Sequence, residues 1–186
     1  MSSLDELLRQ RLLLPDVGWA PTALRHAAVL CPVLAQGGED HVLFVVRPTH
    51  LRQHGGQIAF PGGMREGAEN PLECALRECH EEIGVPASAV HVFGSIAPRE
   101  SSSGILVHCL VGRIPSTPLT TDPSEVARVL QVPLALLLDA SRWQDRVPPS
   151  TATGHQPAHS PHFEFEGELL WGLTARFVRD LAAVLP

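Results

Sequence analysis

Apolar residues recur at helical spacing in one segment of the chain, and that segment carries clear signals at both of its ends. The repeating positions, which would form one buried stripe, are Leu72, Ala75, Leu76, Cys79 and Ile83. Asn70 can cap the start, Pro71 suits the first helical position, and Glu73 completes a capping box. Gly84 supplies a stop. The pattern therefore predicts a helix over residues 71–83.

Apolar and β-branched runs elsewhere predict strands. Residues 27–35 and 41–47 flank Gly37-Gly38, a pair that favours a tight turn, so they predict a β-hairpin. Further strands are predicted over 57–60 (stopped by Pro61-Gly62-Gly63), 90–97, 105–114 and 126–132, a second hairpin over 163–171, and further helices over 3–13, 133–139 and 174–185. Residues 148–161 are rich in Pro, Ser, Thr, Gly and His and are expected to form a surface loop. This mixture predicts an α/β or α+β fold with a mixed sheet.

Length and charge narrow the classes of function. The 186 residues fit one domain, and the formal net charge is −6, from 14 Lys and Arg against 20 Asp and Glu. No basic block is present, which argues against a general nucleic-acid or membrane-surface binder. The apolar runs are shorter than the ~20 residues that span a bilayer, the first residues lack the features of a secretory signal, and none of the four cysteines forms a C-x-x-C pair. We therefore expect a cytoplasmic protein with reduced thiols and a small-molecule partner.

Three carboxylates share one face of the predicted helix. Relative to Glu78, Glu82 lies about 40° to one side and Glu81 about 60° to the other. Like charges at this spacing repel each other, and the last turn of a helix disfavours anions. Arg77 can neutralise only part of the cluster. A solvated face with Glu–Arg pairs is one interpretation, but a hard divalent cation such as Mg²⁺ or Mn²⁺ would relieve both problems.

A longer pattern surrounds these residues. Gly63, five residues, Glu69, seven residues and then the run from Arg77 to Val85 (RECHEEIGV) resemble a complete Nudix box over residues 63–85. Cys79 stands where that family usually has an aliphatic residue, and it is expected to pack as a small apolar side chain. The resemblance implies one Nudix domain over residues 1–186, with an α/β/α sandwich around a mixed central sheet. It also implies Mg²⁺ or Mn²⁺, and substrates in which a nucleoside diphosphate is linked to another group.

A second resemblance lies immediately upstream. Arg47, Arg52, Gly56 and the run Phe60-Pro61-Gly62-Gly63 are spaced as in the coenzyme A pyrophosphatase subfamily, with departures at Leu43-Phe44-Val45 and Pro48. This resemblance implies hydrolysis of coenzyme A to adenosine 3′,5′-bisphosphate and 4′-phosphopantetheine. Two alternatives stay open: a Nudix pyrophosphatase for another derivative such as ADP-ribose or NADH, and an inactive nucleotide-sensing module. The complete carboxylate cluster argues against the latter.

Residue roles follow from these resemblances by position. Glu78 and Glu82 are expected to be the principal metal ligands, Glu81 a third ligand or the holder of a metal-bound water, and the carbonyl of Gly62 a further ligand. Arg77 is expected to orient the carboxylates through contacts with Glu73 or Glu81. Glu69 has two interpretations, as a partner of the helix dipole or as a functional group.

Residues outside the box complete the expected site. Arg47, Arg52 and Gly56 are expected to contact substrate, and Arg52 to favour coenzyme A over dephospho-coenzyme A through its 3′-phosphate. Glu125 is the candidate for the general base or an extra metal ligand, ahead of Glu100. Three further expectations concern Trp171, which should pack in the core, a β-turn over 101–104, and a solvated loop containing His155, His159 and His162.

Overall fold

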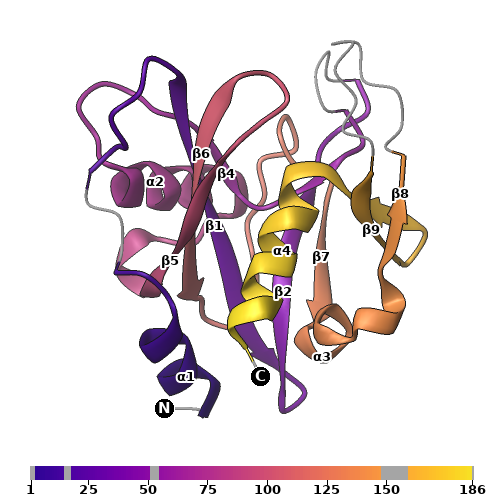
Figure 1. The fold of residues 1–186 in the computed structure, drawn as a ribbon. Coiled ribbons are helices and arrows are strands. Elements are labelled where there is room, and N and C mark those ends of the chain that lie inside the picture. The colour runs from indigo at the N-terminus through magenta and orange to yellow at the C-terminus, as the bar shows by residue number, and fades with distance from the viewer. Residues whose placement is uncertain (1–2, 15–17, 51–54, 148–158, 186) are drawn as a thin grey trace.

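The computed structural model describes residues 3–14, 18–50, 55–147 and 159–185, and its centre is a mixed β-sheet (Figure 1). The strands of this sheet are β1 (Arg25–Gln36), β2 (Glu39–Val46), β3 (Ile58–Ala59), β4 (Gly62–Met64), β5 (His91–Glu100), β6 (Ile105–Arg113) and β7 (Arg128–Pro133). Their order is β3-β2-β1-β6-β5, with β4 added to β1 and β7 added to β2. Strands β1 and β6 run parallel and the other pairs antiparallel, so the predicted mixed sheet is confirmed.

Helices cover both faces of this sheet. Successive residues of β1 point to opposite faces, and apolar residues are buried on both. Ala28 and Leu30 pack with α2 (Pro71–Ile83) on one face, while Ala27 and Cys31 belong to the core on the other. That second face is covered by α1 (Ser3–Arg11), α3 (Leu134–Leu138), α4 (Gly172–Val184) and a small sheet of β8 (Gln144–Arg146), β9 (Ser160–Phe165) and β10 (Glu168–Leu170). Figure 1 shows α4 lying across the sheet. No helix in the described ranges is long and apolar enough to span a membrane.

The elements whose ends are marked by capping or turn residues in the sequence form where the sequence predicts them. Helix α2 has the predicted bounds, both halves of the capping box at Asn70, and Gly84 in the left-handed conformation at its end. The first hairpin turns at Gly37 and Gly38, whose φ angles of 61° and 86° suit the tight turn that a twisted antiparallel pair prefers. Cys79 is fully buried, as its packing role requires.

Four features of the fold differ from the prediction. The short strand β3 ends before Pro61, as predicted, but Gly62 and Gly63 begin a further strand, β4, which pairs with β1. A Cβ atom on Gly62 would lie 2.5 Å from the carbonyl oxygen of Ala28, so only glycine permits this close pairing. The first helix ends at Arg11 instead of residue 13, β8 has no counterpart in the prediction, and β9 begins inside the predicted loop. The rest of that loop, 148–158, lies outside the described residues.

His162 also departs from the prediction. It was expected in a solvated loop with His155 and His159, yet it is buried within β9, where its Nδ1 lies 2.7 Å from the carbonyl oxygen of Ser160. His159 is exposed, and His155 falls outside the described part of the chain. The alternation of β9 explains the difference, since Ser160 and His162 both face inward.

Candidate metal and substrate site

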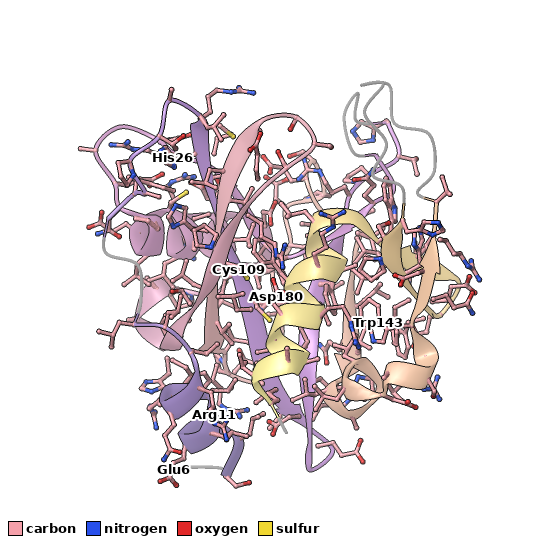
Figure 2. The ribbon with its side chains drawn as sticks, in the orientation of Figure 1. Glu6, Arg11, His26, Cys109, Trp143 and Asp180 are labelled. Carbon is pink, nitrogen blue, oxygen red and sulfur yellow. The ribbon has the colours of Figure 1, made fainter. Side chains whose placement is uncertain are left out.

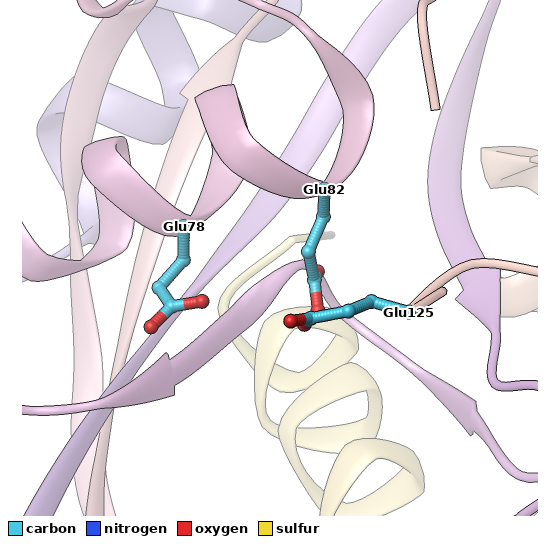
Figure 3. Close-up of side chains that lie close together, drawn as sticks. All are labelled: Glu78, Glu82 and Glu125. Atoms are coloured by element: carbon cyan, nitrogen blue, oxygen red, sulfur yellow. The ribbon is translucent and has the colours of Figure 1, made fainter. Parts of the chain in front are cut away.

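Three carboxylates converge at the C-terminal end of α2. Glu78, Glu82 and Glu125 each offer an oxygen, and these oxygens lie within 4.8 Å of one another (Figure 3). Glu78 and Glu82 are one turn apart on the helix, whereas Glu125 comes from the segment between β6 and β7. The structure thus brings together two carboxylates of the helix and one that is more than forty residues away in the chain.

Backbone hydrogen bonds fix the segment that carries Glu125. The last carbonyls of a helix lack partners within it, and here the N–H of Thr120 donates to Ile83 O at 3.2 Å and that of Asp122 to Glu82 O at 3.1 Å. Beyond the turn at Asp122, the N–H of Ala127 donates to Val46 O at 2.9 Å. Glu125 is therefore held between the end of α2 and the end of β2.

Strand β4 forms the opposite wall of the site. The N–H of Gly62 donates to Glu82 Oε2 at 3.1 Å. Gly63 leaves room for the other helix carboxylate, because a Cβ atom on Gly63 would lie 2.2 Å from Glu78 Oε1. The two glycines therefore let the strand approach both carboxylates closely. The contact shown for Gly62 is made by its N–H, and metal coordination by its carbonyl stays a prediction.

Burial makes this cluster costly without a cation. Glu82 is 1% exposed, and its burial raises the pKa to about 8 against the opposing effects of the Gly62 N–H and Arg47. Glu78 and Glu125 add to that rise through their negative charges. Burial also raises the pKa of Glu78, although Arg77 opposes the shift. Oxygen donors held this close, with their charges poorly compensated, suit a hard divalent cation such as Mg²⁺ or Mn²⁺.

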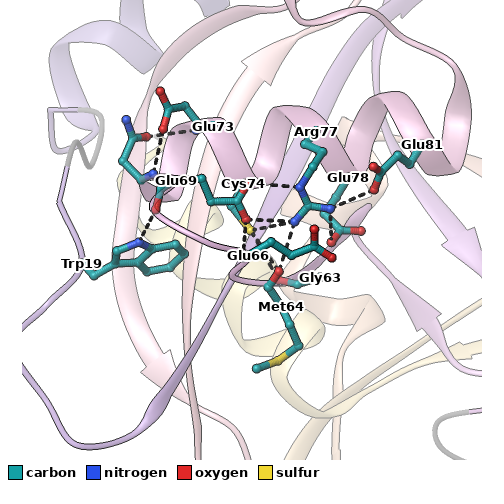
Figure 4. A network of polar contacts seen from close by, with 11 residues as sticks. Trp19, Gly63, Met64, Glu66, Glu69, Glu73, Cys74, Arg77, Glu78 and Glu81 are labelled. Carbon is teal, nitrogen blue, oxygen red and sulfur yellow. Dashed lines mark hydrogen bonds and ion pairs between the residues drawn. The ribbon is translucent and has the colours of Figure 1, made fainter.

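Arg77 links the helix carboxylates to the loop before the helix (Figure 4). Its Nη1 donates to Glu78 Oε1 and Glu81 Oε2, both at 2.8 Å, while Nε and Nη2 donate to the Glu69 carboxylate at 3.0 and 2.9 Å. The hydrogen bonds from Arg77 are the main reason why the pKa of Glu69 falls to about 2. The predicted contact with Glu81 is confirmed, whereas the Glu73 carboxylate instead accepts a bond from the N–H of Asn70 at 2.8 Å.

Glu81 does not join the group of three. Its side chain is 56% exposed and pairs with Arg77 on the outer side of the helix. Its predicted roles as a ligand or as the holder of a metal-bound water remain predictions.

Trp19 supports the network from a distant part of the sequence, and no sequence argument found this role. Its Nε1 donates to the carbonyl oxygen of Glu69 at 2.7 Å, and its ring packs against His26 and His108, with ring centroids 5.0 and 5.1 Å away. Its only signal in the sequence is an isolated tryptophan between two prolines.

A pocket of about 490 Å³ adjoins the carboxylates on the α4 face of the sheet. Arg47 and Gly62 lie beside the carboxylates and also line the pocket, and Arg47 Nη1 lies 3.6 Å from Glu82 Oε1.

The sequence singles out three other residues, Trp171, Gly56 and Arg52. Trp171 lines the pocket and is not packed in the core of a strand as predicted, because β10 ends at Leu170 and Trp171 precedes α4. Gly56 lies beside Arg47 in the chain fold, with its N–H donating to Arg47 O at 3.0 Å. Arg52 lies outside the described residues.

Comparisons with known proteins agree with this geometry. Residues 24–151 match the family model described as NUDIX domain. The Nudix hydrolase NudL of Yersinia enterocolitica is 39% identical over 176 residues, which cover 94% of this chain and 88% of the relative.

Solved structures share the fold at low sequence identity. The Nudix hydrolase RenU of M. smegmatis has a TM-score of 0.57 at 21% identity and covers 94% of this chain and 95% of its own. A binary complex of the C. elegans Ap4A hydrolase has a TM-score of 0.56 at 13% identity, covering 87% of this chain and 98% of its own.

Proposed function

Because the chain belongs to the Nudix hydrolase family, we propose that it hydrolyses the pyrophosphate bond of coenzyme A to adenosine 3′,5′-bisphosphate and 4′-phosphopantetheine. The observation that carries this proposal is the placement of Arg47, the first residue of the upstream pattern, between the carboxylates and the pocket. A guanidinium there is suited to bind a diphosphate whose nucleoside enters the pocket. The residue pattern from Arg47 to Gly63, which resembles that of the coenzyme A pyrophosphatase subfamily, supports coenzyme A over other diphosphates.

The residues present fit the divalent cation that Nudix hydrolases use. Glu78 and Glu82 would hold Mg²⁺ or Mn²⁺, which when bound would polarise a pyrophosphate and lower the pKa of water, and Glu125 would serve either as a third ligand or as the general base. Arg77 keeps Glu78 in place, and Arg47 would bind and orient the diphosphate. Hydrolysis forms one P–O bond to the oxygen of water and breaks the bridging P–O bond, whose oxygen stays on the other phosphorus. A carboxylate of this chain must accept the proton of water, and Glu125 is our candidate.

A substrate panel tests the proposed function. Coenzyme A, dephospho-coenzyme A, ADP-ribose, NADH and Ap4A are incubated with the protein and Mg²⁺ or Mn²⁺, and the products are identified by mass spectrometry. We expect the highest kcat/KM for coenzyme A. A higher value for ADP-ribose or NADH would replace the coenzyme A assignment with the other Nudix pyrophosphatase, and binding without turnover would favour the nucleotide-sensing module.

Glu125→Gln is expected to lower turnover by about 100-fold, because it removes one of three converging carboxylates. If Glu125 is a ligand, the metal concentration for half-maximal rate rises. If it is the base, that concentration is unchanged and the pH dependence of kcat loses one limb. Glu164→Gln, in the small sheet, is a control for the loss of one negative charge. A wild-type rate across the whole pH profile would exclude both roles.

A further inference from the structure

The pocket next to the carboxylates has two chemically different ends. Strand order places β2 and β3 on one side and β6 and β5 on the other, with β1 between them. Arg47 borders the pocket at the end of β2, while the turn Ser101–Ser103 borders it between β5 and β6. Strands lie roughly 4.8 Å apart, so these borders are separated by about two to three spacings, or roughly 10–14 Å. That distance is comparable with the length of one nucleotide.

The far end holds an arginine that has no partner among the described residues. Arg176, on α4, lines the pocket and makes no hydrogen bond or ion pair with any residue that the structure describes. One turn later on the same helix lies Asp180, which Figure 2 labels. Its carboxylate accepts bonds from Nε and Nη2 of Arg99 on β5 at 2.5 and 2.7 Å. Arg176 and Asp180 are four residues apart and therefore share one face of α4. The contact between Asp180 and Arg99 turns this face toward β5.

Hydroxyl groups accompany Arg176 at this end. Ser101 Oγ and Ser103 Oγ lie 3.0 Å apart, and Ser101 Oγ also accepts a bond from the N–H of Ile105 at 3.1 Å. The predicted β-turn is confirmed by the bond from the N–H of Gly104 to Ser101 O at 3.0 Å. Ser102 is exposed at the tip of this turn, beside the pocket. An arginine with several hydroxyl donors is a suitable receptor for a phosphate group.

The middle of the pocket is apolar. Its floor is formed by Ala27 and Val29 of β1 and by Ile105 and Val107 of β6, with Trp171 also in the lining. Such a floor fits a nucleoside better than a second charged group, since a charge placed there would lose its hydration without gaining a partner.

Building on the proposed function, we propose that Arg176 and the Ser101–Ser103 turn bind a second phosphate, carried as a monoester by the nucleoside of the substrate. The diphosphate then lies at Arg47, the nucleoside crosses the apolar floor, and the monoester reaches Arg176. In coenzyme A this group is the 3′-phosphate, so Arg176 would be a specificity residue remote from the bond that is broken.

Glu100 allows a test of the charge of the ligand group that binds at this end of the pocket. It borders the same pocket, is exposed, and makes no ion pair within the described ranges. A phosphate at this end would be repelled by Glu100, whereas a ribose hydroxyl or a base amino group would be attracted to it. Removal of the Glu100 charge therefore distinguishes an anionic ligand group from a neutral donor.

The test compares kcat/KM for coenzyme A and dephospho-coenzyme A in the wild type, Arg176→Gln and Glu100→Gln. A charge-assisted hydrogen bond changes kcat/KM by roughly ten- to a hundredfold. We therefore expect the kcat/KM of the wild type to be at least ~10-fold higher for coenzyme A than for dephospho-coenzyme A. Arg176→Gln should remove most of that preference with little change on dephospho-coenzyme A, and Glu100→Gln should increase it. Arg179→Gln on the same helix, whose guanidinium lies over the Trp143 ring, is the matched control and should leave the preference unchanged.

Three outcomes would overturn the inference: equal losses on both substrates in Arg176→Gln, a lower preference in Glu100→Gln, or a preference abolished by Arg52→Ala and untouched by Arg176→Gln. Absence of coenzyme A hydrolysis by the wild type would instead contradict the proposed function. In that case, calorimetric titration with adenosine 3′,5′-bisphosphate and 5′-AMP decides the inference. Tighter binding of the bisphosphate that is lost in Arg176→Gln supports it, and equal binding of the two nucleotides overturns it.

Discussion

Glu82→Gln is expected to lower turnover by at least ~100-fold while leaving the fold intact. Loss of groups that merely support metal ligands already costs about 10- to 100-fold, and Glu82 is the most buried carboxylate of the three. The amide keeps the shape of the side chain and can still accept the bond from the Gly62 N–H. Steady-state kinetics at saturating Mg²⁺ or Mn²⁺ measures the effect. A near-wild-type rate there would contradict the assignment of this cluster as the metal site.

The same variant should gain stability in metal-free buffer. Burial raises the folded-state pKa of Glu82 to about 8 from its ordinary 4.5. Between these values the folded state binds more protons than the unfolded state, so the free energy of unfolding falls as pH rises from 4.5 to 8. Glutamine removes this dependence, so the Tm of the variant should exceed that of the wild type most clearly near pH 8.

The effect of added metal on Tm provides a second test of the role of Glu82. Added Mg²⁺ or Mn²⁺ should raise the Tm of the wild type, because a ligand that binds only the folded state stabilises it. Glu82→Gln should show a much smaller rise. The exposed Glu81→Gln serves as the comparison for stability, since its carboxylate lies outside the group of three. Identical pH profiles of Tm for Glu82→Gln and the wild type would show that Glu82 is not the group that burial perturbs.

Gly63→Ala should reduce turnover by at least ~10-fold with little loss of stability, because misplacement of a catalytic group by an ångström can cost about a hundredfold. The added methyl group would lie 2.2 Å from Glu78 Oε1, so the flexible carboxylate must move away. The backbone of Gly63 needs no left-handed conformation, which leaves the strand itself free of strain.

The matched control for Gly63→Ala is Gly18→Ala. A Cβ atom on Gly18 meets nothing within 4 Å, and its φ angle lies outside the left-handed region. It should therefore keep the wild-type rate. A weaker affinity for Mg²⁺ in Gly63→Ala, measured by metal titration of the rate, would accompany the displacement of Glu78. Full activity in Gly63→Ala would show that the position of the Glu78 carboxylate is not critical.

Local signals explain which parts of the fold could be predicted. The capping box at Asn70 and the stop at Gly84 act within a few residues of the chain, and α2 has the predicted bounds. The turn at Gly37-Gly38 is equally local. Strand β4 could not be predicted in this way, because it exists only through its pairing with β1, and a glycine pair such as Gly62-Gly63 favours a turn.

The residues of the site also differ in whether a local sequence pattern predicts them. Glu78 and Glu82 follow from helical spacing, and their convergence could be predicted from the sequence. Helical spacing also placed Glu81 on this face, but its contact with Arg77 draws the carboxylate to the exposed side. The hydrogen bond of Trp19 with Glu69 joins positions fifty residues apart, and no local pattern carries that information.

The segment that carries Glu125 is anchored by the N–H groups of Thr120, Asp122 and Ala127. At Thr120 and Ala127 any residue except proline supplies such a donor, so sequence drift there can change the side chain without shifting the acidic group, whereas the Asp122 carboxylate also accepts bonds from the N–H and Oγ of Ser124. A distant homologue can thus keep the geometry while showing no recognisable motif in this stretch. Residues 115–124 therefore offer a place for substitution, and proline at Thr120, Asp122 or Ala127 is the change to avoid.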